Sequence, residues 1–218
     1  MPSVTERFCA TPQGPARVVS HRATKPRASL LLTHGAGGGI DAVDLGALAT
    51  ELPRRGYTVH LLEMPWRVAG KKVAPRPAVL DECFAAVHAT LKIRGPLVLA
   101  GRSAGARVAC RLGDPLGAAG VLALAFPLHP PGRPEASRLT ELQEVACPRL
   151  VIQGERDSFG GPGEFPTGMP DVTLVGVPFA DHSLKVPRRA PVSQEETLDA
   201  VTSAVGTWLD GVVGGPAE

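Results

Sequence analysis

The sequence has little excess charge of either sign. It contains 23 Lys and Arg residues against 21 Asp and Glu residues, for a formal net charge of +2. This balance offers no electrostatic reason to expect a nucleic acid or an anionic membrane as a partner. No apolar run approaches the ~20 residues of a membrane span. The first residues contain no apolar stretch of the kind that marks a signal peptide, so we expect none.

Cysteine is scarce as well, with four residues at Cys9, Cys83, Cys110 and Cys147. None of them forms a C-x-x-C pair, and none has metal-ligand spacing to a histidine. Scattered single cysteines in a chain of this length indicate reduced, mostly buried thiols. We therefore expect a cytoplasmic location, where thiols stay reduced.

The 218 residues suit one domain, which we place at 1–218. Short apolar runs alternate with amphipathic segments, and no internal repeat divides the chain. We expect strands at 28–35, 57–65, 96–101, 120–128, 148–154 and 172–179, and helices at 44–56, 78–93, 106–113 and 193–213. Asp44 is the expected N-cap of the first helix, and Ser193 with Glu196 forms a capping box for the last.

Fully apolar strands that alternate with helices predict an α/β fold, with a mostly parallel sheet covered by helices on both faces. Residues 6–10 and 16–23 are expected to pair as short antiparallel edge strands. In such sheets, functional residues collect in the loops at the carboxyl ends of the strands.

One of these loops contains Gly-Arg-Ser-Ala-Gly at residues 101–105. The G-x-S-x-G pattern is typical of a nucleophilic serine on a sharp turn between a strand and a helix. Its two glycines are small because strand and helix cross closely there. The chain has 25 glycines, so chance matches are easy. Whether Ser103 is a nucleophile depends on what the rest of the chain supplies.

A serine hydroxyl needs a base to take its proton and an acid to orient that base. The α/β-hydrolase arrangement requires the chain order serine, acid, histidine, each after a strand. Asp157 and His182 meet this order and placement, and Glu155 is the rival acid. This placement is a more specific signal than the pentapeptide.

The remaining requirement is a pair of backbone donors for an oxyanion. The N–H of Ala104 follows the serine directly. The second donor is expected from the segment THGAGGG at 33–39, where we favour Ala36, with Gly35 and Gly37 as neighbouring candidates that would also contact substrate. This segment does not match a phosphate loop, because Ile40 occupies the last glycine position of G-x-G-x-x-G.

Five segments, LLLTHGAGGG, LAGRSAG, AFPLHPPGRP, VIQGERDSFG and ADHSLKV, resemble the lidless α/β-hydrolases related to dienelactone hydrolase. They are most similar to a small branch of predicted hydrolases that includes a testis-expressed protein and a subunit of the nonspecific-lethal histone acetyltransferase complex. The resemblance runs from about residue 28 to residue 208. It implies the α/β-hydrolase fold and a triad of Ser103, Asp157 and His182. The short segment between the fourth and fifth apolar strands leaves no room for a large cap.

Several further residues have two interpretations. Arg102 either grips an anionic substrate or points away from the reacting bond. His129 either contacts substrate or holds a proline-rich turn, and His34 is expected to brace the oxyanion loop. The remaining histidines are expected on the surface of strands or helices: His21, His60 and His88.

Together these features predict a serine hydrolase that cleaves small ester or thioester substrates through an acyl-enzyme on Ser103. It would need no metal or organic cofactor, and would act on a small molecule as a monomer or a homodimer. Two alternatives stay open. One is a catalytically silent binding module that reuses the fold. The other is a peptidase or C–C hydrolase for small substrates.

Overall fold

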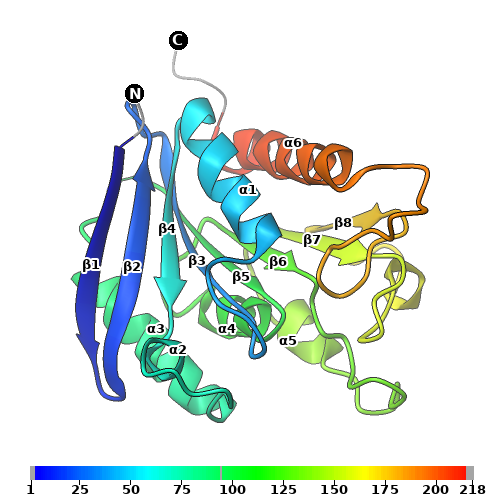
Figure 1. The fold of residues 1–218 in the computed structure, drawn as a ribbon, viewed down its shortest axis with the longest axis horizontal. Helices are drawn as coiled ribbons and strands as arrows, with labels where there is room; N and C mark the ends of the chain where they lie inside the picture. The colour runs from blue at the N-terminus through cyan, green and yellow to red at the C-terminus, as the bar shows by residue number, and fades with distance from the viewer. Residues whose placement is uncertain (1–2, 94, 215–218) are drawn as a thin grey trace.

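The computed structural model describes residues 3–93 and 95–214. In this part of the chain, eight strands form one sheet in the order β1-β2-β4-β3-β5-β6-β7-β8 (Figure 1). Its strands are β1 (Ser3–Thr11), β2 (Gly14–Arg22), β3 (Ala28–Thr33), β4 (Tyr57–Glu63), β5 (Leu97–Arg102), β6 (Gly120–Leu124), β7 (Arg149–Gly154) and β8 (Val172–Val177). Strands β3 to β8 are mutually parallel. The expected α/β class is confirmed.

The first two strands form an antiparallel hairpin at the edge of the sheet, on the left of Figure 1. Each has nine residues, so they are longer than the short edge strands expected from the sequence. β2 also pairs antiparallel with β4, which joins the hairpin to the parallel part of the sheet.

Helices cover both faces of the sheet, because the parallel strands are apolar on both sides. α1 (Val43–Glu51), the short helix η1 (Leu52–Arg55) and α6 (Gln194–Val212) pack on one face. α2 (Pro65–Val68), α3 (Pro77–Thr90), α4 (Ala104–Leu112) and α5 (Leu139–Gln143) pack on the other. Alternate strand residues divide accordingly: Leu30 and Leu32 belong to the first core, and Leu31 to the second. Within residues 3–93 and 95–214, no helix combines the length and apolar character needed to cross a membrane.

Two expected element ends differ in the structure. Asp44 is not the N-cap of α1, because Ala42 takes that position and Asp44 lies buried in the first turn. β6 ends at Leu124 because Ala125 turns the chain with a φ of 46°. The capping box of α6 is confirmed, with Ser193 and Glu196 bonded reciprocally.

The chain between β6 and β7, residues 125–148, contains a single short helix, α5, among its described elements. No cap domain therefore covers the carboxyl edge of the sheet. The loops after β3, β5, β7 and β8 meet at this edge, as expected for parallel strands.

Candidate active site

Ser103 lies on a sharp turn between β5 and α4. Its φ of 54° and ψ of −114° are an uncommon conformation for a residue other than glycine. A Cβ on Gly101 would clash with the backbone of Gly105. A Cβ on Gly105 would lie 2.8 Å from the His34 carbonyl oxygen. The close crossing of strand and helix therefore requires both glycines and holds the strained serine in place.

The structure brings Ser103, His182 and Asp157 together. His182 Nε2 lies 2.8 Å from Ser103 Oγ, and His182 Nδ1 lies 2.8 and 2.9 Å from the two carboxylate oxygens of Asp157. The Asp157 side chain is fully buried. Glu155, the rival acid, instead accepts a hydrogen bond from the Phe179 N–H at 3.2 Å. Geometrically, the imidazole can accept the serine proton while the carboxylate holds the opposite ring nitrogen.

Two residues that the sequence analysis did not identify surround this trio. Gln153 donates a hydrogen bond to Asp157 Oδ2 at 2.9 Å, and the Phe159 N–H donates to Asp157 Oδ1 at 2.8 Å. The Phe159 ring also stacks on His182, with centroids 4.2 Å apart and planes inclined by 29°. Gln153 ends the apolar run 150–152. This polar residue in a strand that was expected to be apolar was the signal that could have identified it. Nothing in the sequence marked Phe159.

The two residues expected to supply oxyanion donors, Ala36 and Ala104, line the same hollow as Ser103. The Ala104 N–H begins helix α4, where no intrahelical acceptor exists for it. The N–H groups of Ala36 and Ala104 donate to no acceptor within the described part of the chain. A Cβ on Gly35 would lie only 3.1 Å from Ser103 Cβ, so the glycine allows the loop after β3 to approach this closely. Both expected oxyanion donors thus lie beside Ser103, as lining residues of one hollow.

His34 makes the contacts expected of a brace for this loop. Its Nδ1 lies 2.8 Å from the Gly35 carbonyl oxygen, and its Nε2 accepts the Met64 N–H at 3.0 Å. Burial lowers the pKa of His34, which favours the neutral ring. A neutral ring with its proton on Nδ1 satisfies both contacts. The ring also lies against Trp66, with centroids 5.1 Å apart.

A hollow of about 660 Å³ opens over Ser103. Its lining comes from the oxyanion loop, the start of α1, the Ser103 turn and the loops after β6, β7 and β8: Gly35, Ala36, Gly37, Gly38, Gly39, Asp41, Ala42, Val43, Asp44, Arg102, Ser103, Ala104, Arg107, Pro127, Arg138, Phe159, His182, Ser183 and Lys185. Gly35, Gly37 and Arg102 are thus among the residues that line this hollow.

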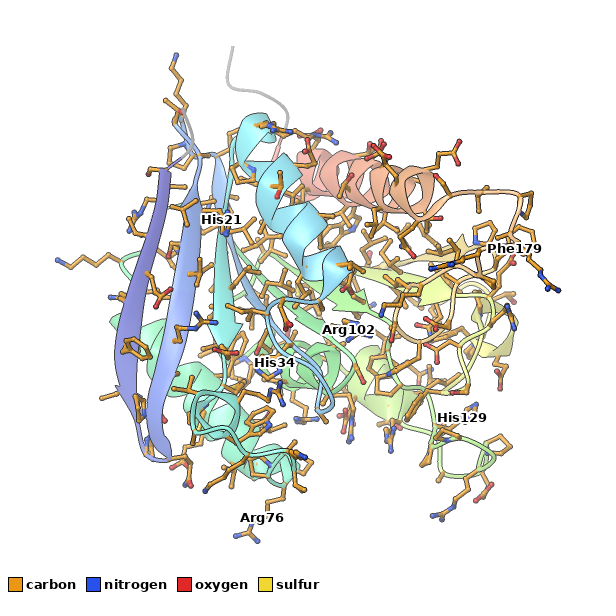
Figure 2. All side chains as sticks on the ribbon, viewed as in Figure 1. His21, His34, Arg76, Arg102, His129 and Phe179 are labelled. Atoms are coloured by element: carbon orange, nitrogen blue, oxygen red, sulfur yellow. The ribbon has the colours of Figure 1, made fainter. Side chains whose placement is uncertain are left out.

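Arg102 neither points into solvent nor reaches freely into the hollow. Its side chain is 11% exposed, and its Nε lies 3.2 Å from Oδ2 of the fully buried Asp44. Its Nη2 donates to the His182 carbonyl oxygen at 3.1 Å. Burial raises the pKa of Asp44, and the positive charge of Arg102 opposes that rise. In Figure 2, Arg102 lies near the centre of the molecule, beneath α1.

His129 is not among the residues that line the hollow. Its Nδ1 lies 2.9 Å from the Pro130 carbonyl oxygen and its Nε2 lies 2.9 Å from Glu164 Oε2. Figure 2 shows it at the lower right, away from Arg102. These contacts favour the interpretation that His129 holds the proline-rich turn, because its ring nitrogens are occupied outside the hollow.

The surface position expected for His60 is wrong. His60 is 6% exposed, and its Nδ1 lies 2.8 Å from the hydroxyl of buried Ser20 on the neighbouring strand. The strand pattern could not show this, because Ser20 comes beside His60 only when β2 pairs with β4. Across residues 3–93 and 95–214, no group of three or more His, Cys, Asp or Glu side chains is arranged to hold a metal ion.

Comparison with known families agrees with this architecture. Residues 26–210 match the family described as the alpha/beta hydrolase domain. The match spans most of the chain, and the protein belongs to this family. No curated protein matches the sequence.

Solved structures show the same fold. A serine hydrolase without a lid from Xanthomonas campestris has a TM-score of 0.74 and 22% identity, with 99% of this chain and 97% of that chain covered. An α/β serine hydrolase homologue from Coxiella burnetii has a TM-score of 0.73 and 17% identity, covering 94% and 97%. A thermophilic esterase from Thermogutta terrifontis has a TM-score of 0.67 and 17% identity, covering 97% and 100%.

Proposed function

We propose that the protein is a serine hydrolase that cleaves small ester or thioester substrates through an acyl-enzyme on Ser103. His182 takes the proton from Ser103 as the hydroxyl attacks the carbonyl, and Asp157 orients His182. The N–H groups of Ala36 and Ala104 bind the resulting oxyanion. His182 then protonates the leaving group, and a water molecule activated by His182 releases the acyl group.

The observation that carries this proposal is the contact of 2.8 Å between Ser103 Oγ and His182 Nε2, with Asp157 on the opposite ring nitrogen. The strained turn at Ser103 supports it, because such strain is retained where the surrounding structure requires it. A silent binding module would be favoured by a histidine out of reach or by a hollow closed by the His129 loop. Neither feature is present in the described residues.

Within the family, we propose a place in the lidless branch related to dienelactone hydrolase and to the testis-expressed and nonspecific-lethal-complex proteins. The five resembling segments support this place, as does the short chain between β6 and β7. Some structural neighbours are described as esterases, and at 17% identity or less their likeness concerns the fold alone. We further propose a cytoplasmic protein of one domain, a monomer or a homodimer, that acts without a cofactor.

A fluorophosphonate probe tests the role of Ser103 directly, because it reacts with activated serines. We expect the label on the peptide that contains Ser103 and its loss in Ser103→Ala. Ser183→Ala is the matched control, because Ser183 lines the same hollow and is expected to leave labelling intact. A folded wild-type protein that stays unlabelled, or a label on another residue, contradicts the proposal.

Rates on matched esters, thioesters and dipeptides then separate the substrate classes. We expect ester and thioester hydrolysis that is lost in Ser103→Ala. Cleavage of dipeptides in preference to esters would favour the peptidase alternative instead.

A further inference from the structure

The lining of the hollow contains more positively than negatively charged side chains. Its charged lining residues, besides His182, are Arg102, Arg107, Arg138, Lys185, Asp41 and Asp44. The charge of Arg102 is matched by Asp44, 3.2 Å away. Asp41 lies on the oxyanion-loop side, where a Cβ on neighbouring Gly39 would approach Asp41, Glu63 and Arg67. Besides Lys185, which comes from the loop after β8, the remaining positive side chains lie towards α4 and α5.

The side towards α4 and α5 begins with Arg107, one turn along α4 from Ser103. The Arg107 N–H donates to the Ser103 carbonyl oxygen at 3.3 Å, so both side chains project from the same face of the helix. Arg107 binds Glu141 of α5 through two hydrogen bonds of 2.7 and 2.5 Å. Glu141 also accepts from Arg111 at 3.0 Å. Its carboxylate is thus shared between two guanidinium groups, of which Arg111 also pairs with Asp81 at 2.7 Å.

Arg138 is the third guanidinium in this cluster, and no carboxylate among the described residues lies within ion-pair distance of it. Its Nη1 donates to the Pro127 carbonyl oxygen at 3.1 Å, and its other N–H groups have no acceptor in the described part of the chain. Burial lowers the pKa of Arg138 and the nearby charge of Arg107 lowers it further, while the charge of Glu141 acts in the opposite direction. An anion at the wall of the hollow would relieve this repulsion and accept the free N–H groups.

We propose that Arg138 binds a carboxylate on the acyl part of the substrate. The preferred substrates are then half-esters or half-thioesters of short dicarboxylic acids. The hollow supports a short acid, because Ser103 and Arg138 both line this space of about 660 Å³ and the reacting carbonyl and the carboxylate must fit within it together. Arg138 comes directly before α5, whereas Asp41 lies in the loop between β3 and α1, so the positive and the negative side chains of the lining come from different segments. This polarity orients an acidic acyl chain towards α5.

The inference rests on the proposed hydrolase function, and its test compares two isosteric alkyl esters. Monoethyl glutarate carries the carboxylate, and the ethyl ester of glutaramic acid carries an amide in its place. We expect the wild-type protein to favour the acid. Arg138→Gln is expected to lower kcat/KM for the acid by about ten- to hundredfold, the range for a lost hydrogen bond to a charged group. The rate on the amide should stay unchanged.

Arg133→Gln is the matched control, because Arg133 lies in the same loop, is exposed and does not line the hollow. It should leave the preference intact, and added salt should weaken the preference in the wild-type protein. If Arg138 only supports the loop, Arg138→Gln lowers both rates equally and the inference is wrong.

A second pair of esters tests which part of the substrate carries the acid. These are 3-acetoxypropanoate and its amide, where the carboxylate lies on the alcohol side. An Arg138 effect confined to this pair contradicts the acyl assignment. Equal wild-type rates on both members of both pairs overturn the inference but leave the hydrolase function standing. If none of the four esters is hydrolysed and Ser103 is not labelled by fluorophosphonate, both the inference and the proposed hydrolase function are wrong.

Discussion

At the scale of single residues, the least expected feature is the ion pair beside the reacting groups. Asp44 is fully buried, and the charged partner that the structure places beside its carboxylate is Arg102, whose Nε lies 3.2 Å from Oδ2. The negative charge of Asp44 is therefore balanced by the positive charge of Arg102. The Arg102 Nη2 also donates a hydrogen bond to the His182 carbonyl oxygen. A buried charge that loses its partner is strongly destabilising, whereas removal of both charges costs much less.

We expect Asp44→Asn and Arg102→Met each to lower the free energy of unfolding by about 3 kcal/mol. The double variant should recover much of this loss, and urea unfolding measures the coupling. Asp41→Asn is the control, because Asp41 is exposed and forms no ion pair in the described residues. Additive losses in the double variant would contradict the account.

A second prediction concerns the buried Ser20–His60 pair. Burial, and then the charges of Arg22 and Arg7, lower the pKa of His60 to about 4. The unfolded chain therefore takes up this proton near pH 6.5 while the folded protein does not. Folding stability falls as the pH drops from about 6.5 to about 4, by up to about 3 kcal/mol from this residue.

His60→Gln removes this titration and keeps a partner for the Ser20 hydroxyl. The wild-type protein should lose more of its unfolding free energy than the variant between pH 6.5 and pH 4. Urea unfolding of both proteins at several pH values measures the difference. Parallel curves would show that the buried histidine is not what makes the fold acid-sensitive.

Sequence and structure agree on the reacting trio for a physical reason. Ser103, Asp157 and His182 each follow an apolar strand, and parallel strands bring such positions to one edge. Phe159 and Arg138 could not be identified in the same way, because their positions depend on the paths of long loops. Arg102 was recognised as a candidate, but its partner Asp44 was mistaken for a helix cap.

At the scale of elements, the alternation of strands and helices was predictable because each strand is a short, fully apolar run. The strand ends were less predictable, since Ala125 ends β6 by a backbone conformation that its side chain does not favour. The hairpin β1–β2 was expected to be short because its exposed outer strand lacks the apolar pattern of the inner ones.

The crossing of β5 and α4 makes the sharpest prediction at this scale. Gly101→Ala places a Cβ against the backbone of Gly105 and Ala106, which cannot move aside as a flexible side chain would. We expect a loss of more than about 3 kcal/mol in unfolding free energy, or no folded protein. Gly37→Ala, where no atom lies within 4 Å of the new Cβ, should keep the wild-type melting temperature. Equal melting temperatures in both variants would contradict the claim that the crossing of β5 and α4 requires glycine at position 101.

At the scale of the whole molecule, the last helix is tied to the segments that lead into β3 and β4. Asp210 of α6 accepts hydrogen bonds from Arg27 and Arg55, each at 2.7 Å, and from the Tyr57 hydroxyl. Burial raises the pKa of Asp210, but these hydrogen bonds outweigh it and hold the pKa below its ordinary value. α6 in turn follows the loop that carries His182, so the last helix anchors that loop against the amino-terminal half.

The central proposal is that Ser103 carries the acyl group during turnover. Mass spectrometry of protein quenched with acid during steady-state hydrolysis of an activated ester tests it most directly. The account predicts one added acyl group, on the peptide that contains Ser103, and none in Ser103→Ala. Turnover with an unmodified Ser103 peptide, or an acyl group on another residue, would contradict it.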